Sequence, residues 1–203
     1  MENRGKIIAV SSPSGGGKTS VVKKILKDFP DIVFSVSATT RPKRPNEVNG
    51  VDYFFVSDEE FEKKIANNEF IEWERFYDYY YGTLKSFVDD NINIGKSVLF
   101  EVDVKGALSL KKIYPESFLI FIDPPSYEEL ITRLKKRKTE SESDLQKRID
   151  RAKMELSFKK DFDYIFVNDE LHKVYKSVKS LIKEIINKEW FNGYYTSWFK
   201  RDR

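Results

Sequence analysis

The sequence predicts an α/β protein built on a parallel β-sheet. Apolar runs typical of strands alternate along the chain with patterns typical of helices, as in βαβ units whose helices cover a parallel sheet. With 203 residues, 40% of them hydrophobic, the chain suits one domain with a normal core. The strands are expected at about 6–11, 97–102, 117–122 and 163–167, and the helices at about 18–28, 104–113, 126–137 and 170–188.

Composition narrows the possible chemistry. The 36 basic and 33 acidic residues leave a net charge of +3, which gives no general case for nucleic-acid binding. Without cysteine, and with His172 as the single histidine, the chain has no disulfide, thiolate nucleophile or histidine cluster. A metal ion is therefore expected to be Mg²⁺, held by oxygen ligands. No apolar run suits a signal sequence or a membrane span, so we expect a cytoplasmic protein without a membrane partner.

The first apolar run leads into a glycine-rich segment, Ser12-Pro-Ser-Gly-Gly-Gly-Lys-Thr19, which opens the first helix. Backbone N–H groups of Gly15, Gly16 and Gly17 can surround a phosphate, Lys18 adds a positive charge, and Thr19 offers a hydroxyl to Mg²⁺. The segment predicts binding of ATP or GTP. It departs from the pattern G-x-x-x-x-G-K-[ST], because Ser12 stands where the pattern has glycine.

The rest of the chain divides into segments that differ in amino-acid composition. Residues 37–94 are rich in tyrosine, phenylalanine, asparagine and glutamate, which indicates an inserted substrate-binding subdomain. Residues 126–158 carry many arginines and lysines with few apolar positions, as a mobile lid does. Residues 189–203 form an aromatic, basic tail, expected to dock on the body of the protein. The core then comprises residues 1–36, 95–125 and 159–188.

The beginning of the insert contains a proline-stiffened basic loop. Arg41 and Arg44 offer planar forks that match phosphate oxygens, and Pro42 and Pro45 restrict the backbone between them. Tyr53 and Tyr81 can add phenolic donors to the same anion. A solvated basic turn is the alternative, since exposed charges often contribute nothing measurable.

Two acids stand at the end of the second apolar run, residues 97–102. Glu101 and Asp103, on either side of Val102, match the position at which enzymes with a glycine-rich phosphate loop hold an acid near Mg²⁺ and substrate. A structural salt bridge is the alternative for both carboxylates, because an unpaired buried charge is costly.

The predicted lid places arginines on two helices. Arg133 and Arg137 have i, i+4 spacing, and Arg148 and Arg151 have i, i+3 spacing. Such arrays can close over a phosphate, although a helix face merely solvated by charge is the alternative, most of all for Arg151. Asn168 ends the last predicted strand, at the edge where an adenine would lie or where a plain turn would form.

Several motifs agree in order and spacing with one family. S-P-S-G-G-G-K-T, S-x-T-T-R-x-x-R-x-x-E-V-N-G-x-D-Y, N-N-E-F-I-E-W, Y-Y-G-T and V-N-D resemble guanylate kinase over about residues 5–185. The resemblance implies a P-loop nucleoside monophosphate kinase fold with a five-stranded parallel core flanked by helices, a GMP-binding subdomain and a helical lid. It also implies transfer of the γ-phosphoryl group of ATP to GMP, with dGMP a further expected acceptor, and Mg²⁺ as cofactor.

The resemblance assigns residues to each substrate. The residues expected to have catalytic roles are Lys18, Arg44, Arg133, Arg137 and Arg148. The Thr19 hydroxyl is expected to bind Mg²⁺. ATP is expected to contact Ser12, Pro13, Ser14, Gly15, Gly16, Gly17, Lys18, Thr19, Ser20, Arg133, Arg137 and Asn168. GMP is expected to contact Ser37, Arg41, Arg44, Glu47, Tyr53, Glu72, Tyr81, Thr83, Glu101 and Asp103. Thr83, Lys105 and Lys138 stand where the family usually has serine, glutamine and glycine.

Three other functions remain open at this stage. A non-catalytic relative would bind a phosphopeptide through the arginine loop, but it would not need Lys18, Thr19 or the lid arginines. A nucleic-acid binder would use the lid and the basic tail and would show a steep salt dependence. A kinase for another monophosphate is disfavoured by Glu72, whose carboxylate can accept from the N1–H and N2–H₂ donors that adenine lacks.

Overall fold

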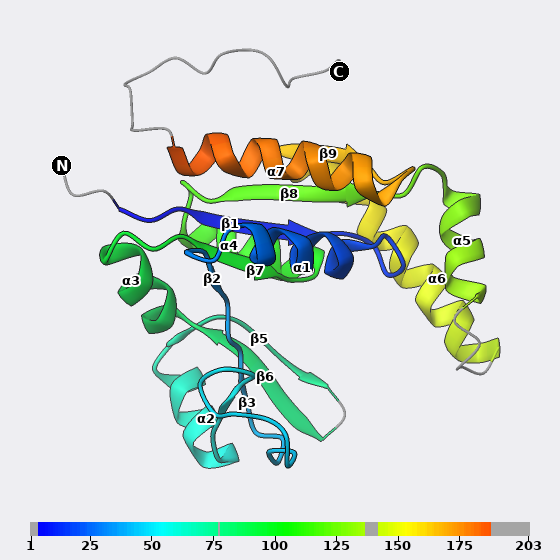
Figure 1. The fold of residues 1–203 in the computed structure, drawn as a ribbon. Helices are drawn as coiled ribbons and strands as arrows, with labels where there is room; N and C mark the ends of the chain where they lie inside the picture. The colour runs from blue at the N-terminus through cyan, green and yellow to red at the C-terminus, as the bar shows by residue number, and fades with distance from the viewer. Residues whose placement is uncertain (1–3, 77, 137–141, 188–203) are drawn as a thin grey trace.

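A five-stranded sheet forms the centre of the protein (Figure 1). The structure is a computed structural model that describes residues 4–76, 78–136 and 142–187. All neighbouring strands of this sheet are parallel, which confirms the predicted α/β fold with a five-stranded parallel core. In spatial order the strands are β2 (Val33–Phe34), β7 (Val98–Glu101), β1 (Ile7–Ser11), β8 (Phe118–Asp123) and β9 (Tyr164–Val167).

Helices cover both faces of this sheet because its strands are apolar on both sides. On one face, Ile8 and Val10 of β1 pack with α1 (Lys18–Asp28) and α7 (Leu171–Asn187). On the other face, Ile7 and Ala9 pack with α3 (Lys85–Asn93) and α4 (Val104–Ile113). All four β1 side chains are at most 2% exposed, so the alternation along one strand supplies both halves of the core.

A second sheet of four strands lies below the central one (Figure 1). Helix α2 (Asp58–Ala66) covers it, with the buried Phe61 ring stacked on Phe70 at 4.3 Å and on Tyr80 at 5.1 Å between centroids. Ser57 and Glu60 form a capping box that begins this helix. In spatial order the strands are β4 (Phe54–Phe55), β3 (Ala38–Thr39), β6 (Tyr79–Leu84) and β5 (Phe70–Phe76).

Two helices stand beyond the carboxyl ends of the central strands (Figure 1). Helices α5 (Tyr127–Lys135) and α6 (Glu142–Ser157) share a small apolar cluster of Leu130, Leu134 and Ala152, and the short helix η1 (Lys159–Asp161) leads on to β9. Arg137, Lys138 and the tail of residues 189–203 lie outside the described residues. In the described part of the chain, no helix has the length and apolar character to cross a membrane.

Candidate active site

The glycine-rich loop joins β1 to α1 at the carboxyl edge of the central sheet. Gly17 is the N-cap of α1 with φ 96°, a left-handed conformation that favours glycine. A Cβ at this position would lie 2.5 Å from the Asn168 side-chain nitrogen. The first turn of α1 carries no acidic side chain, so nothing there offsets the positive end of the helix dipole. The loop thus has the charge and backbone geometry of a phosphate site.

Ser12, the departure from the glycine pattern, fits the loop because of Gly16. Its side chain is buried, and its hydroxyl donates a 3.0 Å hydrogen bond to the carbonyl of Pro13. A Cβ on Gly16 would lie 2.8 Å from the Ser12 Cβ and 3.0 Å from the Pro13 carbonyl oxygen. The space that a side chain at position 16 would fill is therefore taken by the serine.

Lys18 and Thr19 reach from the loop to the end of β7. The Lys18 ammonium donates a 3.1 Å hydrogen bond to the Val102 carbonyl, and the Thr19 hydroxyl donates to the Glu101 carboxylate. Burial lowers the pKa of Lys18, and the carboxylates of Glu101, Glu155 and Asp103 oppose that shift. The neighbouring hydroxyl and carboxylate of Thr19 and Glu101 form the kind of oxygen donor set that suits Mg²⁺.

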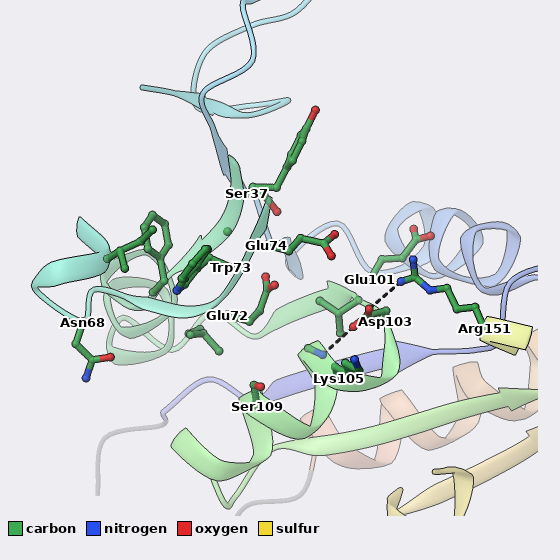
Figure 2. A pocket seen from close by; sticks show the side chains of 17 residues that line it. Ser37, Asn68, Glu72, Trp73, Glu74, Glu101, Asp103, Lys105, Ser109 and Arg151 are labelled. Atoms are coloured by element: carbon green, nitrogen blue, oxygen red, sulfur yellow. Dashed lines mark hydrogen bonds and ion pairs between the residues drawn. The ribbon is translucent and has the colours of Figure 1, made fainter. Parts of the chain in front are cut away.

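A pocket of about 500 Å³ lies between the second sheet and the end of β7 (Figure 2). Glu72 from β5 and Glu101 and Asp103 from the end of β7 line it together. Glu72 accepts a 2.7 Å hydrogen bond from the buried Thr83 hydroxyl, and burial raises the pKa of Glu72. Of the residues expected to contact GMP, those that line this pocket are Ser37, Glu72, Tyr81, Glu101 and Asp103.

The arginine loop is organised around Glu47. Its carboxylate accepts a 2.6 Å hydrogen bond from the Arg41 guanidinium and a 2.8 Å bond from the backbone N–H of Arg44. The Arg41 bond raises the pKa of Arg41 and lowers the pKa of Glu47. Arg41 also lies 5.4 Å above the centre of the Tyr53 ring, which packs edge-on against Tyr81 at 6.1 Å. Arg41 and Glu47 therefore form a largely buried ion pair within the loop, whereas residues 42–46 are exposed.

Arg44 differs from Arg41 in the same loop. Its side chain is exposed, and among the described residues no hydrogen bond or ion pair of its guanidinium is found. Glu47 therefore fixes the backbone of Arg44, while the Arg44 guanidinium can still donate hydrogen bonds to a ligand. A fixed backbone with an available guanidinium suits an anion from solution.

The helices beyond the sheet approach the phosphate loop from its other side. Arg133 on α5 donates a 3.1 Å hydrogen bond to the Asn168 carbonyl, and the Asn168 amide donates a 2.8 Å bond to the Gly16 carbonyl. Arg148 on α6 donates a 3.0 Å bond to the Ser14 hydroxyl. Arg133 and Arg148 thus come from different helices to the same loop.

Comparisons with known proteins agree with this geometry. The family model described as guanylate kinase matches residues 4–185. The chain belongs to the guanylate kinase family. The guanylate kinase of Thermotoga maritima is 48% identical over 89% of this chain and 87% of its own length. The guanylate kinase of Chlorobaculum tepidum is 48% identical over 91% of this chain and 95% of its own length.

A solved guanylate kinase gives the same result for the fold. The crystal structure of guanylate kinase from Anaplasma phagocytophilum matches with a TM-score of 0.68 at 31% identity, covering 93% of this chain and 89% of that chain. The predicted P-loop nucleoside monophosphate kinase fold is thereby confirmed.

This chain differs from the usual guanylate kinase residues at Thr83, Lys105 and Lys138. Lys105 lines the pocket, and no ion pair of its ammonium is found in the described part of the chain. Asp103 is paired instead with Arg151, at 3.0 Å. Thr83 keeps the hydroxyl that bonds Glu72. Lys138, like Arg137, lies outside the described residues.

Sequence reasoning missed two features beside these guanylate kinase motifs. The structure buries Glu155 of α6 against the phosphate loop, where its carboxylate accepts a 3.0 Å hydrogen bond from the Ser14 N–H. It also joins Arg151 to two carboxylates, although a solvated helix face was the alternative most of all for this residue. A single glutamate on a charged helix gives no signal in one sequence. The i, i+4 spacing of Arg151 and Glu155 was the available clue.

Proposed function

We propose that the chain transfers the γ-phosphoryl group of ATP to GMP, with dGMP as a further acceptor, to give ADP and GDP. One observation carries the proposal: Glu101 lines the pocket and also accepts a hydrogen bond from Thr19 of the phosphate loop. A single residue therefore belongs to both substrate sites. Donor and acceptor phosphates bound there would meet at the end of β7, and in-line transfer requires such a meeting.

GMP is proposed to lie in the pocket with its base at Glu72. The Glu72 carboxylate accepts hydrogen bonds, and guanine presents N1–H and N2–H₂ as adjacent donors. Ser37 lines the same pocket and offers a hydroxyl to the base, whereas Thr83 holds Glu72 in place. Arg44, Arg41, Tyr53 and Tyr81 are proposed to hold the monophosphate. The Arg44 guanidinium, which forms no hydrogen bond or ion pair within the described residues, would be its main charged donor.

ATP is proposed to bind along the glycine-rich loop of residues 12–20. The helix dipole of α1 and the Lys18 ammonium would face its phosphates. Arg133 and Asn168 already contact each other near the loop, on the side proposed for the adenine. The Thr19 hydroxyl and the Glu101 carboxylate are the protein oxygens that would hold Mg²⁺, and the bound ion would supply charge neutralisation at the phosphates.

The protein's own part in the reaction is positioning and charge neutralisation. The attacking phosphate oxygen of GMP is ionised near neutral pH, so the proposal needs no general base. Lys18, Arg133, Arg137 and Arg148 would stabilise the charge that spreads over the transferring group. Arg44 would hold the acceptor phosphate against that group. The partners are then free nucleotides, and the proposed location is the cytoplasm, where ATP and GMP are available.

The test is a coupled assay of ADP formation with MgATP and each of GMP, dGMP, AMP, CMP and UMP. We expect GMP-dependent turnover that needs Mg²⁺ and falls by at least about 100-fold in Lys18→Ala, since the ammonium is a charged donor to the transferring group. Turnover with AMP or UMP in preference to GMP would refute the role of Glu72. No turnover with any monophosphate would favour a partner-binding module.

A further inference from the structure

Arg151 on α6 bridges two carboxylates that belong to different parts of the site. Its Nη2 lies 3.0 Å from Oδ2 of Asp103, which lines the pocket, as Figure 2 shows. Its Nε lies 3.0 Å from Oε1 of Glu155, one helical turn further along α6. Both contacts use separate donors of one planar fork, so the two carboxylates fix the direction of the guanidinium.

Glu155 is the unusual member of this group. Its side chain is 5% exposed, whereas that of Arg151 is 48% exposed. One carboxylate oxygen accepts from Arg151 and the other accepts from the backbone N–H of Ser14, both at 3.0 Å. A buried carboxylate therefore lies directly against the loop that is proposed to bind three phosphate groups.

This placement has an electrostatic consequence. A negative charge a few ångströms from the phosphate loop repels a triphosphate unless another group compensates it. In water-poor surroundings, a buried carboxylate is also costly without a cationic partner. Among the described residues, Arg151 is the cation that forms an ion pair with Glu155. The Lys18 ammonium lies in the field of both groups. Burial is the largest cause that lowers the pKa of Lys18, Glu155 opposes this shift, and Arg151 adds to it.

We propose that Arg151 is a positioning residue that neutralises the buried Glu155 carboxylate at the phosphate loop and so permits tight binding of ATP. It acts through Glu155 and not by touching the nucleotide. Asp103 supplies the second anchor, which holds the guanidinium over Glu155. The inference rests on the proposed binding of ATP by this loop. It goes beyond that function, because the arginines proposed to touch the phosphates of ATP are Arg133, Arg137 and Arg148.

The test measures ATP affinity directly. A non-hydrolysable ATP analogue with Mg²⁺ is titrated calorimetrically into the wild type and into Arg151→Met, Glu155→Gln and the double variant. We expect Arg151→Met to raise the dissociation constant by about tenfold, the order expected for an uncompensated charge near the phosphates. The double variant should bind within about threefold of Glu155→Gln alone, because it has no carboxylate to neutralise.

Two controls separate charge neutralisation from other roles. Lys153→Met removes one positive charge from an exposed position of the same helix and should change the dissociation constant by less than about twofold. Arg151→Lys keeps the charge but loses the planar fork. It should bind within about threefold of the wild type, and it supplies the measurement if Arg151→Met does not fold.

The outcomes that overturn the proposal are specific. Wild-type affinity in Arg151→Met would show that Glu155 needs no neutralisation. A loss that persists in the double variant would indicate that Arg151 contacts the nucleotide itself. A tenfold loss in Arg151→Lys would indicate a role of geometry and not of charge. Because the titration needs no turnover, absence of GMP-dependent activity in the wild type would refute the proposed function and leave this comparison intact.

Discussion

Glu72 and Thr83 face each other across β5 and β6, and the Thr83 hydroxyl donates a 2.7 Å hydrogen bond to the Glu72 carboxylate. Burial raises the pKa of Glu72, and this hydrogen bond opposes the rise. The ionised carboxylate is the form that accepts from the donors of guanine. Because its pKa is raised, GMP binding should weaken on the acid side at a higher pH than an ordinary glutamate would cause.

Thr83→Val should move this acid limb further toward neutral pH. Valine keeps the shape of threonine but cannot donate, so the pKa of Glu72 rises further and the carboxylate is protonated at a higher pH. The pH profile of kcat/KM for GMP, recorded at saturating MgATP, measures the shift. Thr83→Ser keeps the hydroxyl and should follow the wild-type profile. Superimposable profiles for Thr83→Val and the wild type would contradict the proposed role of Glu72.

Arg44→Met should weaken GMP binding without affecting the fold. Among the described residues the guanidinium forms no hydrogen bond or ion pair, so its removal leaves no hydrogen-bonded partner unsatisfied. Loss of a charged hydrogen bond to phosphate costs about 1.5–3 kcal/mol, or roughly 10- to 100-fold in the dissociation constant for GMP. Calorimetric titration with GMP measures this loss, and the melting temperature should change by less than about 1 °C.

The matched control for Arg44 is its neighbour Lys43. The Lys43 ammonium donates a 2.9 Å hydrogen bond to the Glu47 carbonyl on the exposed surface of the loop. Lys43→Met removes the same charge and should change GMP affinity by less than about twofold. Equal losses in the two variants would mean that the loop attracts GMP only by its net charge.

Ser12 and Gly16 are predicted to depend on each other. Ser12→Gly restores the usual pattern and should leave ATP affinity within about twofold of the wild type. Gly16→Ala should weaken ATP binding by about tenfold or more, because its Cβ would lie 2.8 Å from the Ser12 Cβ and 3.0 Å from the Ser12 hydroxyl oxygen. Titration of both variants and the double variant with an ATP analogue measures the coupling.

The Ser12→Gly, Gly16→Ala double variant shows whether the contact with Ser12 causes the loss of ATP affinity in Gly16→Ala. Ser12→Gly in the Gly16→Ala background removes two of the three closest atoms, so it should restore part of the lost affinity. The contact of 3.0 Å with the Pro13 carbonyl remains, and recovery should be incomplete. No recovery of ATP affinity would show that the Pro13 backbone, and not Ser12, excludes a side chain at position 16.

The central sheet could be predicted because its strands are buried on both faces. Four apolar runs between helical patterns located β1, β7, β8 and β9 to within about a residue or two. β2 was not located, because it has only Val33 and Phe34, too few residues for a recognisable period. Its pairing with β7 depends on tertiary contact.

The site shows the same division between local motifs and tertiary pairing. The glycine-rich loop could be identified because its phosphate contacts come from consecutive residues. The environment of Glu72 could not, because Thr83 and Asp103 reach it from other parts of the chain. The pairing of Arg41 with Glu47 is local, yet the sequence left a solvated turn open, since charge spacing in a loop does not fix a geometry. Glu155 becomes significant only when α6 lies against Ser14.

A separate cluster ties the amino-terminal helix to the carboxy-terminal one. The Asp28 carboxylate at the end of α1 accepts hydrogen bonds from Lys179 and from the Tyr175 hydroxyl, both on α7. The Lys179 bond is the main cause that lowers the pKa of Asp28, followed by the Tyr175 bond. The cluster therefore links stability to pH in a predictable direction.

Asp28→Asn should lower the melting temperature at neutral pH, and the difference should vanish in acid. With its pKa lowered on folding, Asp28 stabilises the protein above its unfolded-state pKa, and this stabilisation is lost as pH falls through its folded-state pKa. Because the group is exposed, we expect a decrease of only about 1–3 °C at pH 7. The control is Asp31→Asn, which should melt like the wild type, because Asp31 is exposed and forms no hydrogen bond or ion pair among the described residues. Melting curves between neutral pH and about pH 3 measure both variants. If the melting temperature of Asp28→Asn stays equally far below that of the wild type in acid, the cause is the packing of α1 against α7 and not the charge.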